Sequence, residues 1–247
     1  MVPKAMANPI DPNGIFEIDR INARVAPFDW TFPRERAAEI EAMWARDSAA
    51  KSGLFNGRVL IQHHCAVEGG TLVSRYVEAG YKPFYCWNRM GYPPPAMRNG
   101  FAMAALKSRD GAFLLGVMSD HTANAGKIYF AAGTPDKDDV LADGTVDLAG
   151  SVLRELGEET GLRPDEVTIG NGYTALIDTM RVALMRPVFV DLPADEARKV
   201  MLERIAGMEE KELADIHIVR GRADIVPERM PVFMRQYLER EFGALIF

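Results

Sequence analysis

The chain has 247 residues, of which 48% are hydrophobic and 26% charged, and its formal net charge is -6. This composition is typical of a folded globular protein, and the negative charge argues against a nucleic-acid duplex as partner, because duplex binding draws its affinity from basic surfaces. With two cysteines and no apolar run of about 18 residues, the chain is expected to need no disulfides, to span no membrane and to reside in the cytoplasm.

The amino-terminal part predicts a strand followed by a helix. Residues 16–25 alternate apolar and polar side chains, as a half-buried strand does. From Pro33, a residue that suits the first turn of a helix, apolar residues recur at helical spacing up to the polar stretch near Ser48. We expect this helix to bury its apolar side against a partner.

A hairpin and a domain boundary are predicted next. Residues 58–67 and 71–79 have the character of strands and flank the turn residues Gly69-Gly70. The prolines at 93–95 can continue neither a helix nor a central strand, so we place a boundary there. The expected domains are a smaller, β-rich α+β extension at 1–95 and a second domain at 96–247.

The second domain alternates strands with helices. Two apolar runs, 100–108 and 111–119, straddle an Asp-Gly turn, and residues 127–130 supply another strand. A loop rich in Gly, Asp and Pro then leads into a helix that begins at Leu148 and ends before Gly161. This alternation is typical of an α/β layered domain.

Four charged residues stand out on this helix. Glu155, Glu158 and Glu159 lie at i, i+3 and i+4 and place three carboxylates in one patch, with Arg154 one turn before Glu158. Like charges at this spacing oppose the helix by roughly 0.2–0.5 kcal/mol per pair, and Arg154 offsets only part of this. The patch therefore suits a hard cation such as Mg²⁺. The alternative is a solvated helix face with an Arg154–Glu158 ion pair on an unrelated α/β fold.

The string RELGEETGL, at Arg154–Leu162, resembles the core of the Nudix box. That core reads Arg-Glu-apolar-any-Glu-Glu-any-Gly-apolar, and all seven specified positions match. Upstream, KIYF followed by AAG is similar to the strand and Pro-Gly-Gly turn of the Nudix hydrolase superfamily, with Gly133 at the second glycine. The resemblance implies a Nudix-type α/β/α sandwich from about Arg98 to the carboxyl end.

The resemblance also implies the chemistry of the site. Glu155, Glu158 and Glu159 correspond to the metal-binding and base-forming glutamates, and Arg154 to the arginine that orients them. Gly133 can lend a backbone carbonyl to the metal. The implied function is a metal-dependent hydrolase that uses Mg²⁺ or Mn²⁺ to cleave the phosphoanhydride bond of a small-molecule nucleoside diphosphate derivative.

The upstream half of the box departs from the pattern. Val140 and Val146 occupy places where the family has a glycine and a glutamate, and an insertion around 137–143 could have displaced this half. Three acidic residues of the loop are candidates to replace the missing carboxylate: Asp136, Asp143 and Asp147. Asp147 is more simply explained as the N-cap of the helix. The departures support a second hypothesis, a catalytically degenerate module that binds a nucleotide or a protein.

Outside the box, no residue is assigned a catalytic role. His63 and His64 are consecutive on a strand and point to opposite faces, so they cannot share a zinc ion. A further carboxylate often assists in this family. Six residues are candidates, none of which stands out: Asp195, Glu196, Glu203, Glu209, Glu210 and Glu212.

The amino-terminal part gives one indication of the substrate. SGLFNG, at Ser52–Gly57, resembles the extension of animal UDP-sugar diphosphatases, which implies a nucleoside diphosphate sugar such as a UDP-sugar. Four aromatic residues could stack on a base, although packing in the core is their more common use: Tyr81, Tyr85, Trp87 and Tyr92.

Overall fold

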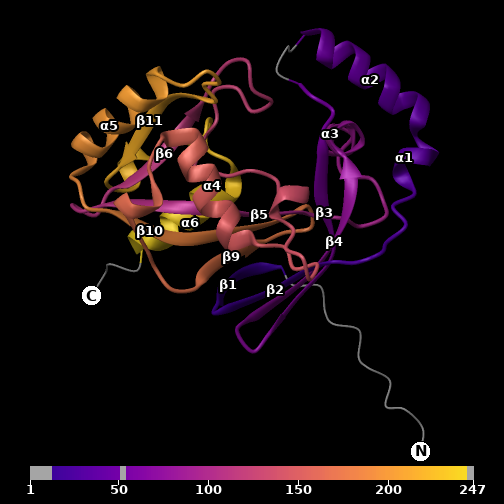
Figure 1. Cartoon of the computed structure of the whole chain (residues 1–247), viewed down its shortest axis with the longest axis horizontal. Coiled ribbons are helices and arrows are strands. Elements are labelled where there is room, and N and C mark those ends of the chain that lie inside the picture. The colour runs from indigo at the N-terminus through magenta and orange to yellow at the C-terminus, as the bar shows by residue number, and fades with distance from the viewer. Residues whose placement is uncertain (1–12, 51–53, 244–247) are drawn as a thin grey trace, which may run out of the picture.

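The computed structural model describes residues 13–50 and 54–243, which form two sheets (Figure 1). The larger sheet has eight strands in the order β1-β9-β10-β5-β6-β11, with β7 paired to β6 and β8 to β10. These strands are β1 (Gly14–Ile18), β5 (Asn99–Ser108), β6 (Phe113–Met118), β7 (Ile128–Tyr129), β8 (Val167–Ile169), β9 (Tyr173–Ile177), β10 (Arg181–Val190) and β11 (Leu213–Val219). Strands β5 and β10 are parallel. No helix in the described part of the chain is long and apolar enough to cross a bilayer.

Helices cover both faces of the larger sheet. Side chains along β5 alternate between the faces, so Ala102 packs with α4 (Leu148–Thr160) and α5 (Ala194–Ala206) in one cluster. Met103 packs on the opposite side with α6 (Val232–Gly243). The three layers, visible in Figure 1, confirm the predicted α/β/α sandwich.

Helix α4 is delimited by its own end residues. The Asp147 carboxylate accepts a hydrogen bond from the Gly150 amide (2.9 Å) and is the N-cap. Gly161 ends the helix in the left-handed region, at φ 73°, which glycine adopts without steric cost. Between these ends, Val152 and Leu156 are buried against the sheet. The predicted helix is therefore confirmed at both ends.

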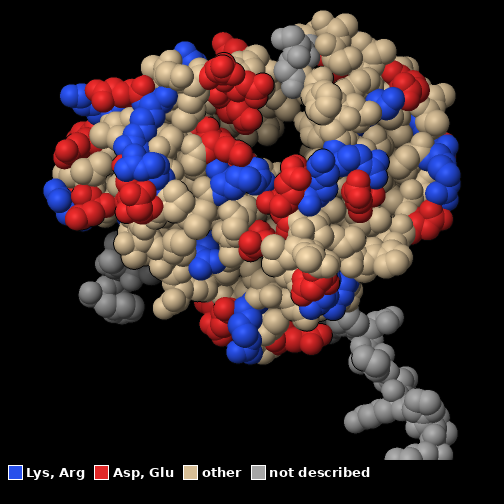
Figure 2. Space-filling model, in the orientation of Figure 1, with Lys and Arg blue, Asp and Glu red and all other residues tan. Residues whose placement is uncertain are grey.

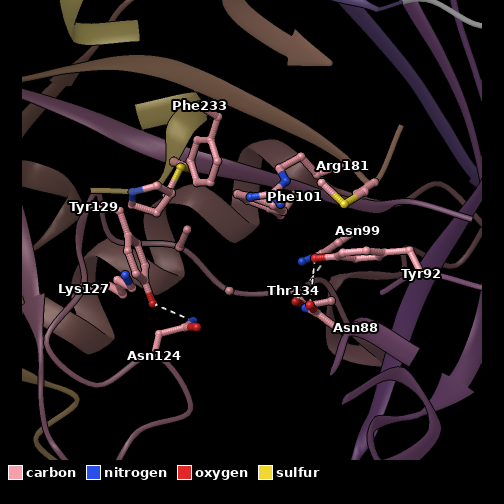
Figure 3. Close-up of a pocket in the computed structure, with 15 residues that line it drawn as sticks. Asn88, Tyr92, Asn99, Phe101, Asn124, Lys127, Tyr129, Thr134, Arg181 and Phe233 are labelled. Carbon is pink, nitrogen blue, oxygen red and sulfur yellow. Dashed lines mark hydrogen bonds between the residues drawn. The ribbon is translucent and has the colours of Figure 1, made fainter. Parts of the chain in front are cut away.

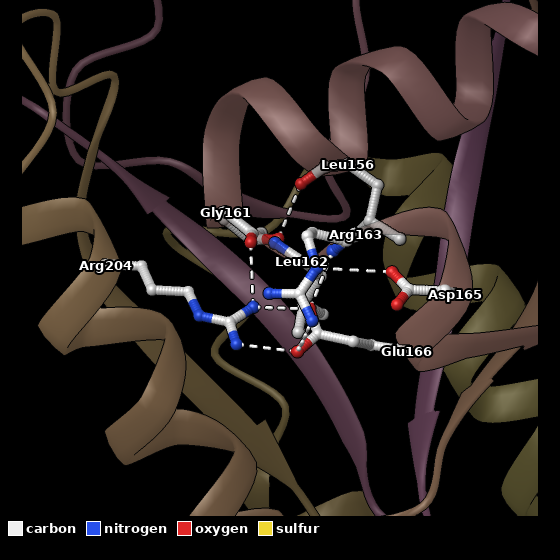
Figure 4. Close-up of polar contacts among 8 residues, drawn as sticks. Leu156, Gly161, Leu162, Arg163, Asp165, Glu166 and Arg204 are labelled. Atoms are coloured by element: carbon white, nitrogen blue, oxygen red, sulfur yellow. Dashed lines mark hydrogen bonds and ion pairs between the residues drawn. The ribbon is translucent and has the colours of Figure 1, made fainter.

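An ion-pair network fixes the carboxyl end of α4 (Figure 4). Arg204 of α5 donates to the Gly161 carbonyl (2.8 Å) and to both carboxylate oxygens of Glu166 (2.6 and 2.7 Å). The Glu166 carboxylate also accepts a hydrogen bond from the Arg163 amide (2.9 Å). The hydrogen bonds from Arg204 are the main reason that the pKa of Glu166 falls to about 2. These contacts hold the helix that carries the glutamates against α5.

The smaller sheet has the strand order β2-β4-β3 and packs with three helices. Its elements are β2 (Arg20–Val25), α1 (Phe32–Glu35), α2 (Ala37–Ala50), β3 (Arg58–Glu68), β4 (Thr71–Gly80) and α3 (Tyr81–Arg89). Strands β3 and β4 form the predicted hairpin, with Gly69 and Gly70 at its turn. The single helix predicted from Pro33 is present as α1 and α2, and α3 was not predicted.

The single strand predicted at 16–25 is wrong, because this segment divides between the two sheets. Strand β1 pairs with β9 of the larger sheet, whereas β2 pairs with β4 of the smaller one. The break lies at Asp19, where the amides of Asp19 and Arg20 both donate to the Gly70 carbonyl (2.7 and 3.2 Å). Alternating side chains identify extended chain but do not identify the sheet that it joins. The domain boundary at residue 95 stays a prediction.

The two sheets meet beside the loop that follows β7. The backbones of Gln62 and Arg98 exchange two hydrogen bonds (3.0 and 2.8 Å). The Leu60 amide donates to the carbonyl of Pro135 in that loop (2.7 Å). The amino-terminal part is thereby held next to the loop that contains Gly133.

Candidate active site

The loop after β7 lies against helix α4. The Ala132 amide donates a hydrogen bond to Glu159 Oε1 (2.9 Å). Gly133 approaches Glu155 so closely that a Cβ added to it would lie 2.2 Å from Oε1 of that carboxylate. A side chain at position 133 would therefore displace the Glu155 carboxylate, which is the end of a flexible side chain. Gly133 lies beside the predicted glutamates, and its role toward a metal stays a prediction.

Glu159 is a buried carboxyl with an incomplete set of partners. The residue is 5% exposed. Its Oε1 accepts the hydrogen bond from Ala132, whereas Oε2 has no partner among the residues that the structure describes. Burial raises the pKa of Glu159 well above its ordinary range, and the nearby charges of Glu212 and Glu155 raise it further. A buried oxygen without a partner is costly, so this position suits an added ligand.

Glu155 is the second carboxyl with a perturbed pKa. Burial raises its pKa to about 7, and repulsion from Glu158 and Glu212 acts in the same direction. The Arg154 guanidinium opposes this, because its Nη1 lies 2.9 Å from Glu155 Oε1. A carboxyl that titrates near neutral pH in a polar cluster is a candidate functional group.

Arg154 connects three carboxylates. Its Nη1 also contacts Glu158 Oε2 at 3.0 Å, which is the ion pair named in the alternative interpretation of this helix. Its Nη2 contacts both oxygens of Asp139, at 3.0 and 3.1 Å. The Asp139 side chain is only 3% exposed, so these two contacts from one nitrogen anchor the arginine at a buried carboxylate. Asp139 thus fixes the guanidinium that in turn fixes Glu155 and Glu158.

Asp139, which the sequence did not single out, is the acidic residue of this loop that pairs with Arg154. Asp136 caps the short 3-10 helix Lys137–Asp139, and Asp143 faces Arg24 at 3.5 Å, so neither pairs with Arg154. The physical reason is a fold-back of the loop: Val140 bridges Val146, and the Asp147 amide donates to the Asp139 carbonyl (2.7 Å). The insertion stays a prediction, but the fold-back lies in an overlapping segment. The fold-back brings Asp139 beside the start of α4 despite the long spacing in sequence.

The three glutamates of the helix are close together but are not arranged as a ready metal site. Within 13–50 and 54–243, no three His, Cys, Asp or Glu side chains form a group that could hold an ion. The reason is that Arg154 engages Glu155 and Glu158, and the Glu158 side chain is 61% exposed. The donor set nevertheless fits a hard cation, because Glu159 has an unpartnered buried oxygen and Glu155 carries a raised pKa. The metal-binding role of these residues stays a prediction.

One carboxylate beyond the helix stands out among the six candidates. Glu212 lines the cleft. Burial is the largest cause of its raised pKa, and repulsion from Glu210 and Glu158 raises the pKa further. Its charge in turn raises the pKa of both Glu155 and Glu159. Sequence patterns could not single out Glu212, because its neighbourhood in the fold comes from the loop before β11.

A cleft of about 760 Å³ separates the segment 209–212, which precedes β11, from the amino-terminal part. Its walls include Glu209, Glu210 and Glu212 on one side and Leu54, Phe55 and Tyr81 on the other. Figure 2 shows a hollow between the two parts, with acidic side chains along the rim of the larger-sheet part. The cleft is large enough for a small-molecule ligand, for which roughly 300–1,000 Å³ is usual.

Comparisons with known proteins give matches among solved structures. The Nudix hydrolase RenU of M. smegmatis is 12% identical over 60% of this chain and 86% of its own, with a TM-score of 0.39. The Ap4A hydrolase of C. elegans is 15% identical over 59% of this chain and 96% of its own, with a TM-score of 0.39. The Nudix domain of Shewanella oneidensis NrtR, solved with ADP ribose, is 16% identical over 65% and 97%, with a TM-score of 0.39.

Two of these structures are of Nudix proteins by name. A scan against protein-family models gives no match, and a search of curated protein sequences gives no significant match.

Proposed function

We propose that the chain is a Nudix-type, metal-dependent pyrophosphohydrolase that cleaves a nucleoside diphosphate linked to another moiety. The observation that carries the proposal is the pair Glu155 and Glu159: two desolvated carboxyls beside Gly133, one with a pKa of about 7 and the other with an unpartnered buried oxygen. Such an arrangement costs stability in the absence of a cation, so a function offers the best explanation of it.

Glu155, Glu158, Glu159 and the Gly133 carbonyl are the groups that would hold the metal. Bound Mg²⁺ or Mn²⁺ supplies neutralisation of the diphosphate and lowers the pKa of an attacking water. Glu212, which already perturbs two of these glutamates, is the nearest candidate for a further carboxylate.

Residues of the chain itself position the glutamates and set their charge. Arg154, anchored by Asp139, positions Glu155 and Glu158. Without metal, burial raises the pKa of Glu155 to about 7, and a bound cation would lower it because it favours the ionised carboxylate.

A UDP-sugar is the first substrate to test. The motif that resembles UDP-sugar diphosphatases is Ser52–Gly57, of which residues 52–53 lie outside the described part of the chain. Its Leu54 and Phe55 line the cleft, and Phe55 is 79% exposed there. An exposed aromatic at the mouth of a cleft suits contact with a ligand.

A second candidate function is a degenerate module that binds a nucleotide without turnover. It is favoured by the ion pairs of Arg154 with both Glu155 and Glu158, and by Val140 and Val146 in the upstream half of the box. Ligand binding without any product dependent on Mg²⁺ would select this function.

The test is a hydrolysis assay with nucleotide sugars, dinucleotides, coenzyme A and nucleoside triphosphates, with Mg²⁺ or Mn²⁺. We expect a phosphate-bearing product from at least one nucleotide sugar, and no turnover after Glu158→Gln or Glu159→Gln with the fold retained. Glu203→Gln, an exposed residue of α5 paired at 4.0 Å with Lys199, is the matched control. Calorimetry with Mn²⁺ gives a readout independent of turnover. No product from any substrate would refute the proposed activity.

A further inference from the structure

A second pocket, of about 270 Å³, is lined in part by Gly133 and its neighbours Ala132 and Thr134 (Figure 3). It shares Asn124, Tyr129, Ala132 and Thr134 with the larger cleft, so the two are neighbours. Its volume is below the roughly 300–1,000 Å³ of a pocket that holds a whole drug-sized ligand. The pocket therefore accepts one end of a molecule whose remainder lies in the cleft.

The walls of this pocket combine flat apolar surfaces with amides. Four aromatic rings line it: Tyr92, Phe101, Tyr129 and Phe233. Three asparagine side chains offer both donors and acceptors: Asn88, Asn99 and Asn124. Among the described lining residues none is acidic, in contrast to the cleft. Lys127 and Arg181 also line the pocket, so its walls suit a planar ring with hydrogen-bonding edges that is joined to an anionic group.

The amino-terminal part closes this pocket with a strained residue. Tyr92 has φ 60°, and it is the one residue other than glycine at positive φ within 13–50 and 54–243. A bulky side chain rarely adopts this conformation, and residues held in it cluster at ligand-binding sites. The surroundings of Tyr92 hold it there: its amide donates to the Trp87 carbonyl (3.0 Å), and its ring packs edge-on against Trp87 at 4.8 Å between centroids.

Tyr92 also acts together with Asn88 of α3. The Tyr92 hydroxyl donates to Asn88 Oδ1 (2.7 Å), which leaves the Asn88 amide nitrogen as a donor at the pocket wall. Figure 3 shows Tyr92 and Asn88 on one side of the space, with Tyr129 and Phe233 on the opposite side. A ring bound between them would therefore contact both parts of the chain.

The pocket adjoins the glutamates through Gly133. This residue lines the pocket and also lies against the Glu155 carboxylate. A molecule with its ring in the pocket can therefore place a diphosphate next to Glu155 without a long spacer.

We infer that this pocket binds the nucleobase of the substrate, and that Asn88 and Tyr92 determine which base is accepted. The inference rests on the proposed function for the identity of the neighbouring site, but the pocket is testable on its own. The amino-terminal part then serves as a specificity element that completes the site.

The experiment is calorimetric titration of the full chain, without metal, with UMP, CMP, AMP, GMP and ribose 5-phosphate. We expect at least one nucleotide to bind about tenfold more tightly than ribose 5-phosphate, since stacking of a base on an aromatic ring is worth about 1–3 kcal/mol. Tyr92→Leu should lose about this tenfold preference for the nucleotide over ribose 5-phosphate, whereas Tyr92→Phe should retain most of the preference. Asn88→Ala should change the ranking of the bases. Phe28→Leu, an aromatic of the same part that lines neither pocket, should bind as the parent does.

The outcomes separate the pocket from the activity. Equal binding of ribose 5-phosphate and all nucleotides would overturn the inference, as would full affinity in Tyr92→Leu. If Tyr92→Leu fails to fold, the test rests on Asn88→Ala, because Asn88 is exposed and its replacement should leave the fold intact. An unchanged order of nucleotide affinities in that variant would overturn the inference. Hydrolysis of diphosphates without preference for a base would overturn the pocket and leave the activity standing. Base binding without hydrolysis would support the pocket and refute the activity.

Discussion

Replacing Glu155 with Gln should make the metal-free protein more stable above neutral pH. The pKa of this carboxyl is about 7 in the folded protein against an ordinary 4.5, and at 1.36 kcal/mol per pKa unit the difference corresponds to roughly 3 kcal/mol. Because the folded pKa is raised, the stability that this group contributes is complete below pH 4.5 and is lost as pH rises through 7. Glutamine does not titrate, so the advantage of the variant should grow across this window.

The assay is urea unfolding followed by tryptophan fluorescence between pH 4.5 and 8, with EDTA present. The free energy of unfolding of Glu155→Gln should equal that of the parent near pH 4.5 and exceed it by about 3 kcal/mol at pH 8. Added Mg²⁺ should narrow the gap, because a ligand of the folded state stabilises the parent more. Glu203→Gln controls for the loss of a surface charge. An unchanged free energy at pH 8 would show that the Glu155 carboxyl is well solvated, which would refute the argument.

Three further predictions concern the supports of the site. Asp139→Asn should cost about 1.5–3 kcal/mol in urea unfolding and slow turnover through Arg154, whereas Asp143→Asn, whose side chain is 62% exposed, should stay within about 0.5 kcal/mol of the parent. Gly133→Ala should displace Glu155 and reduce both Mn²⁺ affinity and turnover, whereas Gly221→Ala, whose Cβ would meet nothing within 4 Å, should change neither. Arg204→Met should cost about 1.5–3 kcal/mol at pH 7. Because the pKa of Glu166 is lowered, this stabilisation is present above pH 4.5 and lost as pH falls toward 2, so parent and variant should converge in acid.

The elements predicted well from sequence are those fixed by local signals. Helix α4 follows from Asp147 at its start and Gly161 at its end, and both residues act within a few positions of their partners. The hairpin of β3 and β4 follows from Gly69-Gly70 for the same reason. The clustering of Arg154 with the glutamates of α4 could also be predicted from the sequence, because the spacing along a helix fixes which side chains are neighbours.

The parts that sequence did not reveal depend on contacts between distant segments. Asp139 reaches Arg154 because the loop between them folds back on itself, and no pattern in the loop distinguishes Asp139 from its acidic neighbours. Glu212 enters the site from the segment before β11. The second pocket likewise needs Tyr92 and Phe233, which the chain brings together only through its tertiary packing.

The path of the chain at Asp19 has a practical consequence for dissecting the molecule. Strand β1 lies on the outer side of β9, and it comes from the segment that precedes the smaller sheet. A fragment that begins at residue 96 would lack β1, and β9 would become an open edge whose unpaired amides and carbonyls invite aggregation. Expression of the carboxyl-terminal part in isolation therefore calls for a circular permutation or a fused peptide that restores residues 14–18.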